Sequence, residues 1–257
     1  MKVLIWLLAF LVPTCALADD QDIKTLYAQY GVEGTLIITS LNERTTYVHN
    51  TKRAHQRFLP ASTFKIPNTL IALDQSVIRD DKQIIPWDGQ DKGRSIWNKD
   101  QTLSSAFQVS CIWCYQEFAQ QIGQETYLQY LSALRYGNQK TGPNLTSFWL
   151  DGDLRISAHE QISFMRDLVD ESLPFKKDHL KFLKQIMIED HTPRYTLRAK
   201  SGWATRTPEQ HGWYVGYIEV DNQTWLFANN IHINQPSDAK YRKKLVVEAF
   251  KAKGVID

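Results

Sequence analysis

Segments rich in strand-forming residues lie near both ends of this chain, and a long helical stretch separates them. Near the start, residues 35–41 and 45–50 are rich in β-branched residues, with a turn at 42–44 between them. Three further segments with strand-forming residues follow near the end: residues 195–201, 212–220 and 223–230. Asp221-Asn222 is a turn signal between the last two. Because tight turns join antiparallel neighbours, we expect one antiparallel sheet assembled from both ends of the chain.

Helical patterns dominate the middle of the chain, from residue 63 to about residue 188. The clearest apolar periodicities cover residues 66–73, 113–122, 127–134 and 158–168. Ser157 is a plausible N-cap of the last of these, and residues 237–253 predict a closing helix. The pattern predicts an α/β fold of the α+β type, with the sheet flanked by helices. We expect a single domain over 19–257, with a sheet lobe (about 19–60 and 190–257), a helical lobe (about 61–189) and the site between them.

The first residues resemble a secretory signal peptide. Lys2 supplies the positive start, residues 3–12 the apolar core, and Ala16-Leu17-Ala18 a small-x-small cleavage site. The apolar run is too short to span a bilayer, and no later run is long enough, so we expect no stable membrane anchor. Export followed by cleavage after Ala18 is the interpretation that we favour.

Charge and histidine spacing argue against two classes of function. Cleavage removes Lys2 and takes the formal net charge from +2 to +1. This balance, without a basic run interleaved with aromatic residues, argues against nucleic acid as the main partner. The seven histidines form no His-Glu-x-x-His or similar spacing, so we expect no metal site.

Two cysteines, Cys111 and Cys114, remain after the expected cleavage removes Cys15. A Cys-x-x-Cys pair in an exported protein is a disulfide, a redox site or a pair of thiols. The redox interpretation lacks a surrounding thioredoxin-like βαβ pattern and is disfavoured. The sequence leaves a structural bridge and two half-buried thiols as open alternatives.

Ser62 and Lys65 place a hydroxyl and an amine three residues apart on an expected helix. At this spacing the two side chains share one helical face, with Cβ atoms about 5–6 Å apart. A neighbouring lysine that has lost its charge, or has been modified, can take the proton of a serine and so make it a nucleophile. Pro60 and Ala61 lead into the pair, so we expect Ser62 near a helix N-terminus, where unpaired N–H groups favour negative charge. The pair indicates a serine acyl-transfer enzyme.

Two short motifs occur twice, and their context separates the copies. Ser237 and Lys240 repeat the Ser-x-x-Lys spacing, but they follow Pro236 and precede a helix-like run, so Ser237 is interpreted as a helix N-cap. Lys140 and Lys200 each begin a basic-hydroxyl-Gly triplet. Lys140 lies in a proline-flanked loop, whereas Lys200 lies on a strand, whose edge holds a lysine, a hydroxyl and a backbone N–H in fixed register. We therefore expect Lys200 to be functional and Lys140 to be a solvated loop residue.

Several motifs follow one another along the chain. They are Ser62-Thr63-Phe64-Lys65, Ser110-Cys111-Ile112, Tyr136-Gly137-Asn138, Phe148-Trp149-Leu150 and Lys200-Ser201-Gly202, with Trp87-Asp88-Gly89, Trp97-Asn98 and Trp213-Tyr214-Val215-Gly216 as supporting matches. In this order and spacing they resemble the class D (oxacillinase-type) serine β-lactamases over nearly the whole mature chain. Ile112 stands where that family usually has valine, and adds a methylene near the base. The resemblance implies a β-lactamase/transpeptidase-like fold and hydrolysis of β-lactams.

The resemblance also implies a catalytic set: Ser62, Lys65, Ser110, Trp149 and Lys200. In it Lys65 is carboxylated by carbon dioxide and is the general base for the nucleophile Ser62; no other cofactor is implied. Carboxylation needs a neutral amine, and an apolar pocket made by Phe64, Ile112 and Leu150 disfavours the charged form. The indole N–H of Trp149 can donate to the carbamate, and Ser110 with Lys200 passes a proton to the lactam nitrogen.

The substrate-binding set that the resemblance implies is Ser201, Gly202, Trp203, Arg242, Ile112, Tyr136 and Leu150. Backbone N–H groups of Ser62 and Trp203 are expected to bind the oxyanion. Arg242 and Ser201 are expected to bind the drug carboxylate, since a guanidinium binds a carboxylate bidentately. The connection at residues 204–211 resembles that of carbapenem-hydrolysing members of the family, so carbapenem hydrolysis is a further hypothesis.

Two other functions share these motifs. A β-lactam sensor domain normally sits behind membrane-spanning segments, and a cell-wall D,D-peptidase lacks the Phe148-Trp149-Leu150 cradle and is usually larger or membrane-anchored. Hydrolysis is favoured over both. The expected partner is a small-molecule β-lactam, bound by a periplasmic protein that is a monomer or a homodimer.

Overall fold

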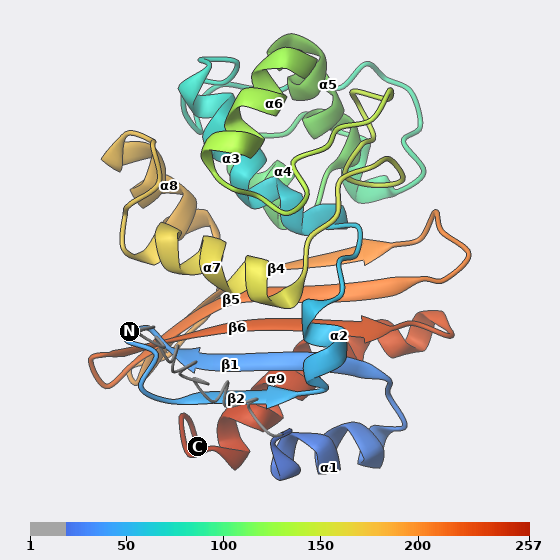
Figure 1. The fold of residues 1–257 in the computed structure, drawn as a ribbon. Helices are drawn as coiled ribbons and strands as arrows, with labels where there is room; N and C mark the ends of the chain where they lie inside the picture. Colours follow the sequence, from blue (N-terminus) through green and yellow to red (C-terminus); the bar gives the residue numbers. More distant parts are fainter. Residues whose placement is uncertain (1–18) are drawn as a thin grey trace, which may run out of the picture.

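The structure, a computed structural model, describes residues 19–257; the expected signal peptide at 1–18 lies outside the described residues. The described chain forms a six-stranded antiparallel sheet with helices on both faces (Figure 1), which confirms the expected fold class. The strands are β1 (Gly34–Ser40), β2 (Thr46–His49), β3 (Ile188–His191), β4 (Tyr195–Ala204), β5 (His211–Val220) and β6 (Gln223–His232). The α-helices are α1 (Gln21–Tyr30), α2 (Thr51–His55), α3 (Lys65–Asp74), α4 (Leu103–Gln108), α5 (Ile112–Ile122), α6 (Gln124–Ala133), α7 (Ala158–Val169), α8 (Lys177–Ile186) and α9 (Tyr241–Ala252). Short 3-10 helices are η1 (Ala61–Phe64), η2 (Ser95–Trp97) and η3 (Pro236–Lys240).

The sheet joins the two ends of the chain, as the sequence predicts. Its strand order is β2-β1-β6-β5-β4-β3, and β1 pairs with β6 from Gly34 opposite Ile231 to Ser40 opposite Trp225. Strands β5 and β6 form a hairpin whose turn residues, Asp221 and Asn222, have φ angles of 48° and 62°. Two successive left-handed residues are typical of a tight hairpin turn, and asparagine and aspartate tolerate that conformation.

The sheet separates two apolar cores. On one face α1 and α9 cover the strands (Figure 1), and Ile38, Phe227 and Phe250 are fully buried between them. On the other face α7 lies against β6 and β1 with α2 beside it, and helices α3, α4, α5 and α6 lie farther from the sheet. Strand β4 is the second strand from one edge of the sheet. It packs against η1, the short helix that leads into α3.

Helix α1 and strand β3 have no counterpart among the expected elements. Only Ile23 and Tyr27 of α1 are buried, so the helix shows little apolar periodicity. The side chain of Asp20 caps it by accepting a hydrogen bond from the Ile23 amide at 3.1 Å. Strand β3 is four residues long and mostly exposed, and such a strand has no apolar pattern of its own.

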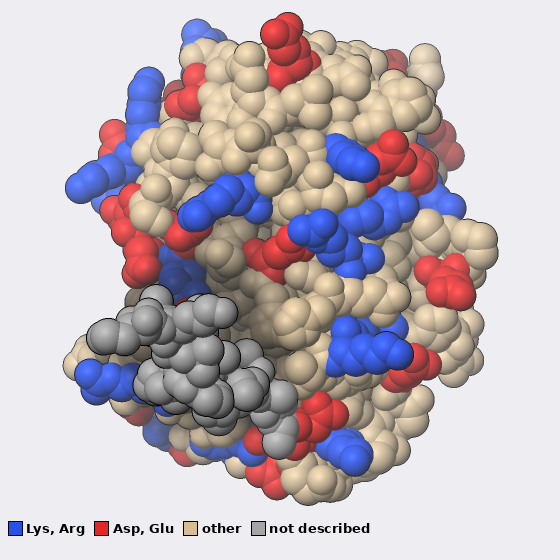
Figure 2. Space-filling view, viewed as in Figure 1, with Lys and Arg blue, Asp and Glu red and all other residues tan. Residues whose placement is uncertain are grey.

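None of the helices within residues 19–257 has the length and apolar character needed to cross a membrane. Acidic side chains lie among the basic ones on the face shown in Figure 2. This mixture agrees with the nearly balanced formal charge of the chain.

Candidate active site

Ser62 and Lys65 lie where η1 passes into α3, on one continuous helical turn. The Lys65 Nζ donates a hydrogen bond to the Ser62 Oγ at 3.4 Å. Ala61, directly before the serine, has a φ of 48°, a left-handed conformation that is costly for a residue with a Cβ. Its amide donates to the Trp149 carbonyl at 2.9 Å, and this bond helps to hold the strained turn in place.

Lys65 is buried with a relative exposure of 0 %. Burial lowers the pKa of its amine well below the ordinary value, and the nearby positive charge of Lys200 lowers it further. The ring of Tyr115, on α5, lies 4.8 Å from the Lys65 Nζ. The described residues include no acidic group among the causes of this shift, so the surroundings favour the neutral amine.

Trp149 is equally buried and carries an unpaired donor. Its ring stacks on Phe64 at a centroid distance of 5.7 Å and meets Phe148 edge-on at 4.9 Å. The Trp149 Nε1 has no hydrogen-bond partner among the described residues. A buried N–H without an acceptor is rare and costs about 1–3 kcal/mol, so the indole indicates a site that an acceptor can fill.

Ser110 and Lys200 come from distant segments and meet directly. The Lys200 Nζ, on β4, donates to the Ser110 Oγ at 2.5 Å. Ser110 lies in the short break between α4 and α5 with a φ of 56°. Burial lowers the pKa of Lys200 to about 8; Glu189 opposes this shift and Arg242 adds to it.

The edge of β4 lies against the turn that carries Ser62. A Cβ added to Gly202 would lie 2.9 Å from the Pro60 carbonyl oxygen and 3.2 Å from the Thr63 amide nitrogen, so only glycine allows this approach. The Ala199 amide donates away from β5, to the Met187 carbonyl at 2.8 Å. Because alternate residues of a strand point their N–H groups to the same side, the Trp203 N–H also points away from β5, toward η1. The geometry places a backbone donor of β4 beside the Ser62 turn.

Arg242 lies in the first turn of α9 and reaches the same strand. Its Nη1 donates to the Gly202 carbonyl at 2.7 Å, and its Nε donates to the Ala239 carbonyl at 2.8 Å. Ser201 pairs in register with Tyr214, whose side chain belongs to the core beneath α9. Residues directly opposite in an antiparallel pair share a face, so Ser201 and Arg242 lie on the same side of β4.

Tyr136 does not lie where a substrate can touch it. It is 1 % exposed and packs between Phe64, at 5.7 Å, and Phe164, at 5.1 Å. Its ring therefore supports the Ser62–Lys65 turn from within the core. Of the other expected contact residues, Leu150 is 6 % exposed, and Ile112 and Trp203 are half-buried.

The remaining copies of the duplicated motifs lie apart from this cluster. Lys140 is exposed in the loop after α6. Ser237 and Lys240 are exposed in η3, where the Lys240 Nζ lies 5.0 Å from the Tyr241 ring.

Sequence reasoning missed two residues that support the cluster. Tyr115 was detectable in principle, since it lies three residues after Ile112 and so shares its face of α5. Gln161 is different: its Nε2 donates to the Thr63 Oγ1 at 3.0 Å across 98 positions of sequence, and no local pattern signals that contact.

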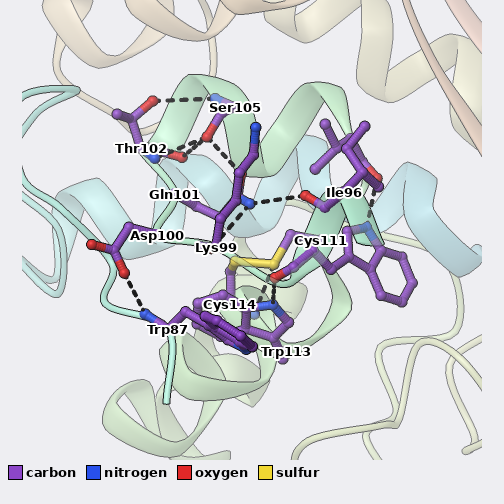
Figure 3. Close-up of a disulfide and its surroundings, with 12 residues drawn as sticks. Trp87, Ile96, Lys99, Asp100, Gln101, Thr102, Ser105, Cys111, Trp113 and Cys114 are labelled. Atoms are coloured by element: carbon purple, nitrogen blue, oxygen red, sulfur yellow. Dashed lines mark hydrogen bonds between the residues drawn. A yellow bond between two sulfur atoms is a disulfide. The ribbon is translucent and has the colours of Figure 1, made fainter. Parts of the chain in front are cut away.

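Cys111 and Cys114 form a disulfide at the start of α5 (Figure 3). This settles the alternatives that the sequence leaves open in favour of a bridge. Both cysteines are buried, with a relative exposure of 0 %.

Comparison with known proteins gives consistent matches. The family model described as the penicillin-binding protein transpeptidase domain matches residues 33–252. The chain is 40% identical to β-lactamase OXA-48 of Klebsiella pneumoniae over 230 residues, covering 90% of this chain and 87% of that protein. It is similar in structure to the class D β-lactamase YbXI from Nostoc, with a TM-score of 0.88, 39% identity, and coverage of 90% of this chain and 98% of that one. It is also similar to FUS-1 (OXA-85), a class D β-lactamase from Fusobacterium nucleatum subsp. polymorphum, with a TM-score of 0.90, 34% identity, and coverage of 93% and 100%.

Proposed function

The chain belongs to the class D β-lactamases, enzymes that hydrolyse β-lactam antibiotics, and we propose that Ser62 is its nucleophile and Lys65, carboxylated by carbon dioxide, its general base. The observation that carries this proposal is the pairing of a buried lysine amine, 3.4 Å from the Ser62 Oγ, with a buried tryptophan N–H that finds no acceptor within residues 19–257.

The surroundings of Lys65 fit a carbamate. Carbon dioxide adds to a neutral amine, and burial favours that form of Lys65. The unpaired Nε1 of Trp149 offers a donor to the new carboxylate group, and the aromatic rings around Phe64 keep water away. A carbamate at Lys65 supplies the base for both halves of the reaction.

Ser62 attacks the lactam carbonyl carbon. Two backbone N–H groups donate hydrogen bonds to the carbonyl oxygen, which becomes negatively charged. The Ser62 amide lies on η1, and the Trp203 amide lies on the edge of β4 that faces it. The strand and the turn can approach this closely because Gly202 has no side chain. A donor of this kind is typically worth about 2.7–4 kcal/mol of transition-state stabilisation. The close approach of the strand to the turn is therefore part of the catalytic geometry.

Ser110 and Lys200 deliver a proton to the departing lactam nitrogen. The Ser110 hydroxyl gives its proton to that nitrogen and is replenished by the Lys200 ammonium, which already donates to it. With this assignment the cleaved C–N bond ends as an ester to Ser62 and an amine N–H. The proton that the Lys65 base took from Ser62 restores the Lys200 ammonium, so the base is free again when water hydrolyses the ester.

Arg242 and Ser201 bind the carboxylate of the drug. The Arg242 guanidinium donates to the backbone carbonyls of Gly202 and Ala239, and it keeps further N–H donors for a ligand. Trp203 and Ile112, which are half-buried, contribute apolar contacts beside the reacting bond, whereas Leu150 is 6 % exposed and belongs to the apolar core.

The test of this function is turnover of a chromogenic cephalosporin by the wild-type protein, with and without added bicarbonate. We expect many turnovers per enzyme molecule and a carbon-13 NMR carbamate signal that a Lys65→Met variant lacks. If the protein were acylated once and did not turn over again, the proposed hydrolysis would be contradicted. If an active enzyme gave no carbamate signal, only the carboxylation of Lys65 would be contradicted.

The alkaline limb of the pH profile is expected at about pH 8 or above, because burial lowers the pKa of Lys200 to about 8 and the negative charge of a carbamate on Lys65 would raise it again. Below that pH the ammonium is present and replenishes Ser110; above it the donor is lost, so kcat/KM falls as the pH rises. Lys200→Arg keeps a cation that does not titrate in this range, so its slower reaction should lose the limb. The measurement is kcat/KM between about pH 6 and pH 10 in both proteins. A limb near pH 8 that persists in Lys200→Arg would show that another group titrates.

We further propose that the short β4–β5 connection allows carbapenem hydrolysis. Arg206 of this connection pairs with Asp151, Nη1 to Oδ2 at 2.8 Å, and so ties it to the segment after Leu150. Arg206→Ala is expected to lower imipenem turnover about tenfold or more relative to penicillin turnover, since the loop loses its attachment. Arg194→Ala is the control, because Arg194 pairs with the exposed Asp257. An imipenem acyl-enzyme that never reaches a second turnover in the wild type would rule out this activity.

The N-terminal sequence supports export to the periplasm with cleavage after Ala18. A periplasmic enzyme meets β-lactams before they reach the cell-wall enzymes. N-terminal sequencing of the protein from a periplasmic extract tests this assignment.

A further inference from the structure

The Cys111–Cys114 disulfide lies next to Ser110, the proposed proton donor, and includes the other two residues of the Ser110-Cys111-Ile112 motif. Figure 3 shows the bridge between Cys111 and Cys114. In the sequence Ser110 directly precedes the first cysteine, and Ile112 lies between the two. Both cysteines are fully buried, so the bond is not placed to exchange with a partner thiol. Any role of this disulfide must therefore come from the residues that it holds in position.

Ser110 occupies a backbone position that needs support. Its φ of 56° is left-handed, and it lies between the end of α4 at Gln108 and the start of α5 at Ile112. Its amide donates to Phe107 at 3.2 Å, a long hydrogen bond. The Ser110 Oγ nevertheless has to lie within hydrogen-bond distance of Lys200, which belongs to the sheet.

At the N-terminus of α5 a covalent bond joins the N-cap residue to the residue three positions later. Cys111 is the N-cap, and its Sγ accepts from the Cys114 amide at 3.2 Å. In ordinary helices a serine, threonine, aspartate or asparagine takes this position, and a side chain three residues later often completes the cap. Here the same two positions are joined through sulfur. The start of α5, and with it the residue that follows Ser110, is fixed in position.

Two tryptophans hold the same segment independently. The Trp97 Nε1 donates to the Val109 carbonyl at 3.0 Å, just before Ser110, and the Trp113 Nε1 donates to the Trp97 carbonyl at 3.0 Å. These hydrogen bonds keep the segment folded without the disulfide. Loss of the bridge is therefore expected to loosen Ser110 rather than unfold α5.

We propose that the Cys111–Cys114 disulfide is a positioning element for Ser110, which keeps the Ser110 Oγ aligned between Lys200 and the substrate during acylation; this inference rests on the role of Ser110 in the proposed function. The cysteines act through Ser110 and touch no reacting atom.

A double-mutant cycle tests the inference. Cys111→Ala/Cys114→Ala is made with Ser110 present and again with Ser110→Ala, and the acylation rate constant is measured by rapid quench and mass spectrometry of the Ser62 adduct. Removal of the cysteines should slow acylation about ten- to a hundredfold when Ser110 is present, the size expected for a misplaced catalytic group, and less than about twofold when it is absent. The carbon-13 carbamate signal of Lys65 should not change. Cys111→Ser/Cys114→Ala keeps an acceptor at the N-cap without the cross-link, and should remain slower than wild type.

Three results would overturn the inference: equal losses in both backgrounds, no loss in either, or full recovery by the serine cap. If Ser110→Ala alone leaves acylation unchanged, the proposed role of Ser110 fails and this inference fails with it. If Ser110→Ala is slow but the cysteine variants are not, only the inference fails. Should the variants not fold, the wild-type chain made in a reducing cytoplasm is compared before and after oxidation. Faster acylation after oxidation supports the inference, and equal rates contradict it.

Discussion

Replacing Ser62 with alanine is expected to lower β-lactam turnover by about 10⁴- to 10⁶-fold, since the chain then lacks the oxygen that we propose attacks the lactam carbonyl. The fold should be retained, because Ser62 is only half-buried and Ala61 and Thr63 hold the turn through backbone and side-chain bonds. Turnover of a chromogenic cephalosporin and the mass of the drug-treated protein are the measurements. The variant should show no drug adduct.

The chain contains its own control for this experiment. Ser237 and Lys240 have the same spacing as Ser62 and Lys65, but both are exposed in η3. Ser237→Ala should therefore turn over the cephalosporin at the wild-type rate. A Ser62→Ala variant that still forms a stable drug adduct, or a Ser237→Ala variant that loses activity equally, would contradict the assignment of the nucleophile.

Replacing Trp149 with phenylalanine is expected to weaken carbon dioxide binding at Lys65 by about ten- to a hundredfold. The exchange keeps an aromatic ring beside Phe64 but removes the unpaired Nε1 donor. A hydrogen bond to a charged group contributes about 1.5–3 kcal/mol, which corresponds to this change in affinity. The carbon-13 carbamate signal should therefore need much more bicarbonate to saturate. Turnover should fall in ordinary buffer and recover in part as bicarbonate is added.

Trp213→Phe is the matched control for Trp149→Phe. Trp213 is also fully buried, but its Nε1 already donates to the Leu59 carbonyl at 2.9 Å. Loss of that bond should reduce the free energy of unfolding by about 0.5–1.5 kcal/mol and leave the bicarbonate dependence unchanged. Equal carbamate occupancy in wild type and Trp149→Phe at low bicarbonate would show that the indole does not bind the modified lysine.

All strands of the sheet except β3 were predictable, because their signals are local. β-branched residues mark β1, the aromatic residues Trp225 and Phe227 mark β6, and Asp221-Asn222 marks the turn that joins β5 to β6. The expected N-cap of α7 is likewise present, since the Ser157 Oγ accepts from the Glu160 amide at 3.2 Å. Such features depend on a few adjacent side chains, which the sequence lists in order.

The tertiary part of the site was not predictable in the same way. Ala61 and Ser110 have left-handed conformations, and neither alanine nor serine is a residue type that predicts one. The burial of Tyr136 shows the same limit, because a residue in a recognisable motif can support the site from the core instead of touching the ligand. Motifs indicated which residues belong to the site, whereas packing decided which of them face the substrate.

The close contact of Gly202 with the Ser62 turn limits how this enzyme can change under antibiotic selection. Any side chain at 202 would push β4 away from Pro60 and Thr63 and separate the two proposed oxyanion donors. The β4–β5 connection has no such restriction, since Thr205, Pro208 and Glu209 are exposed. We expect resistance variants with new drug preferences to accumulate there, while position 202 stays closed to them.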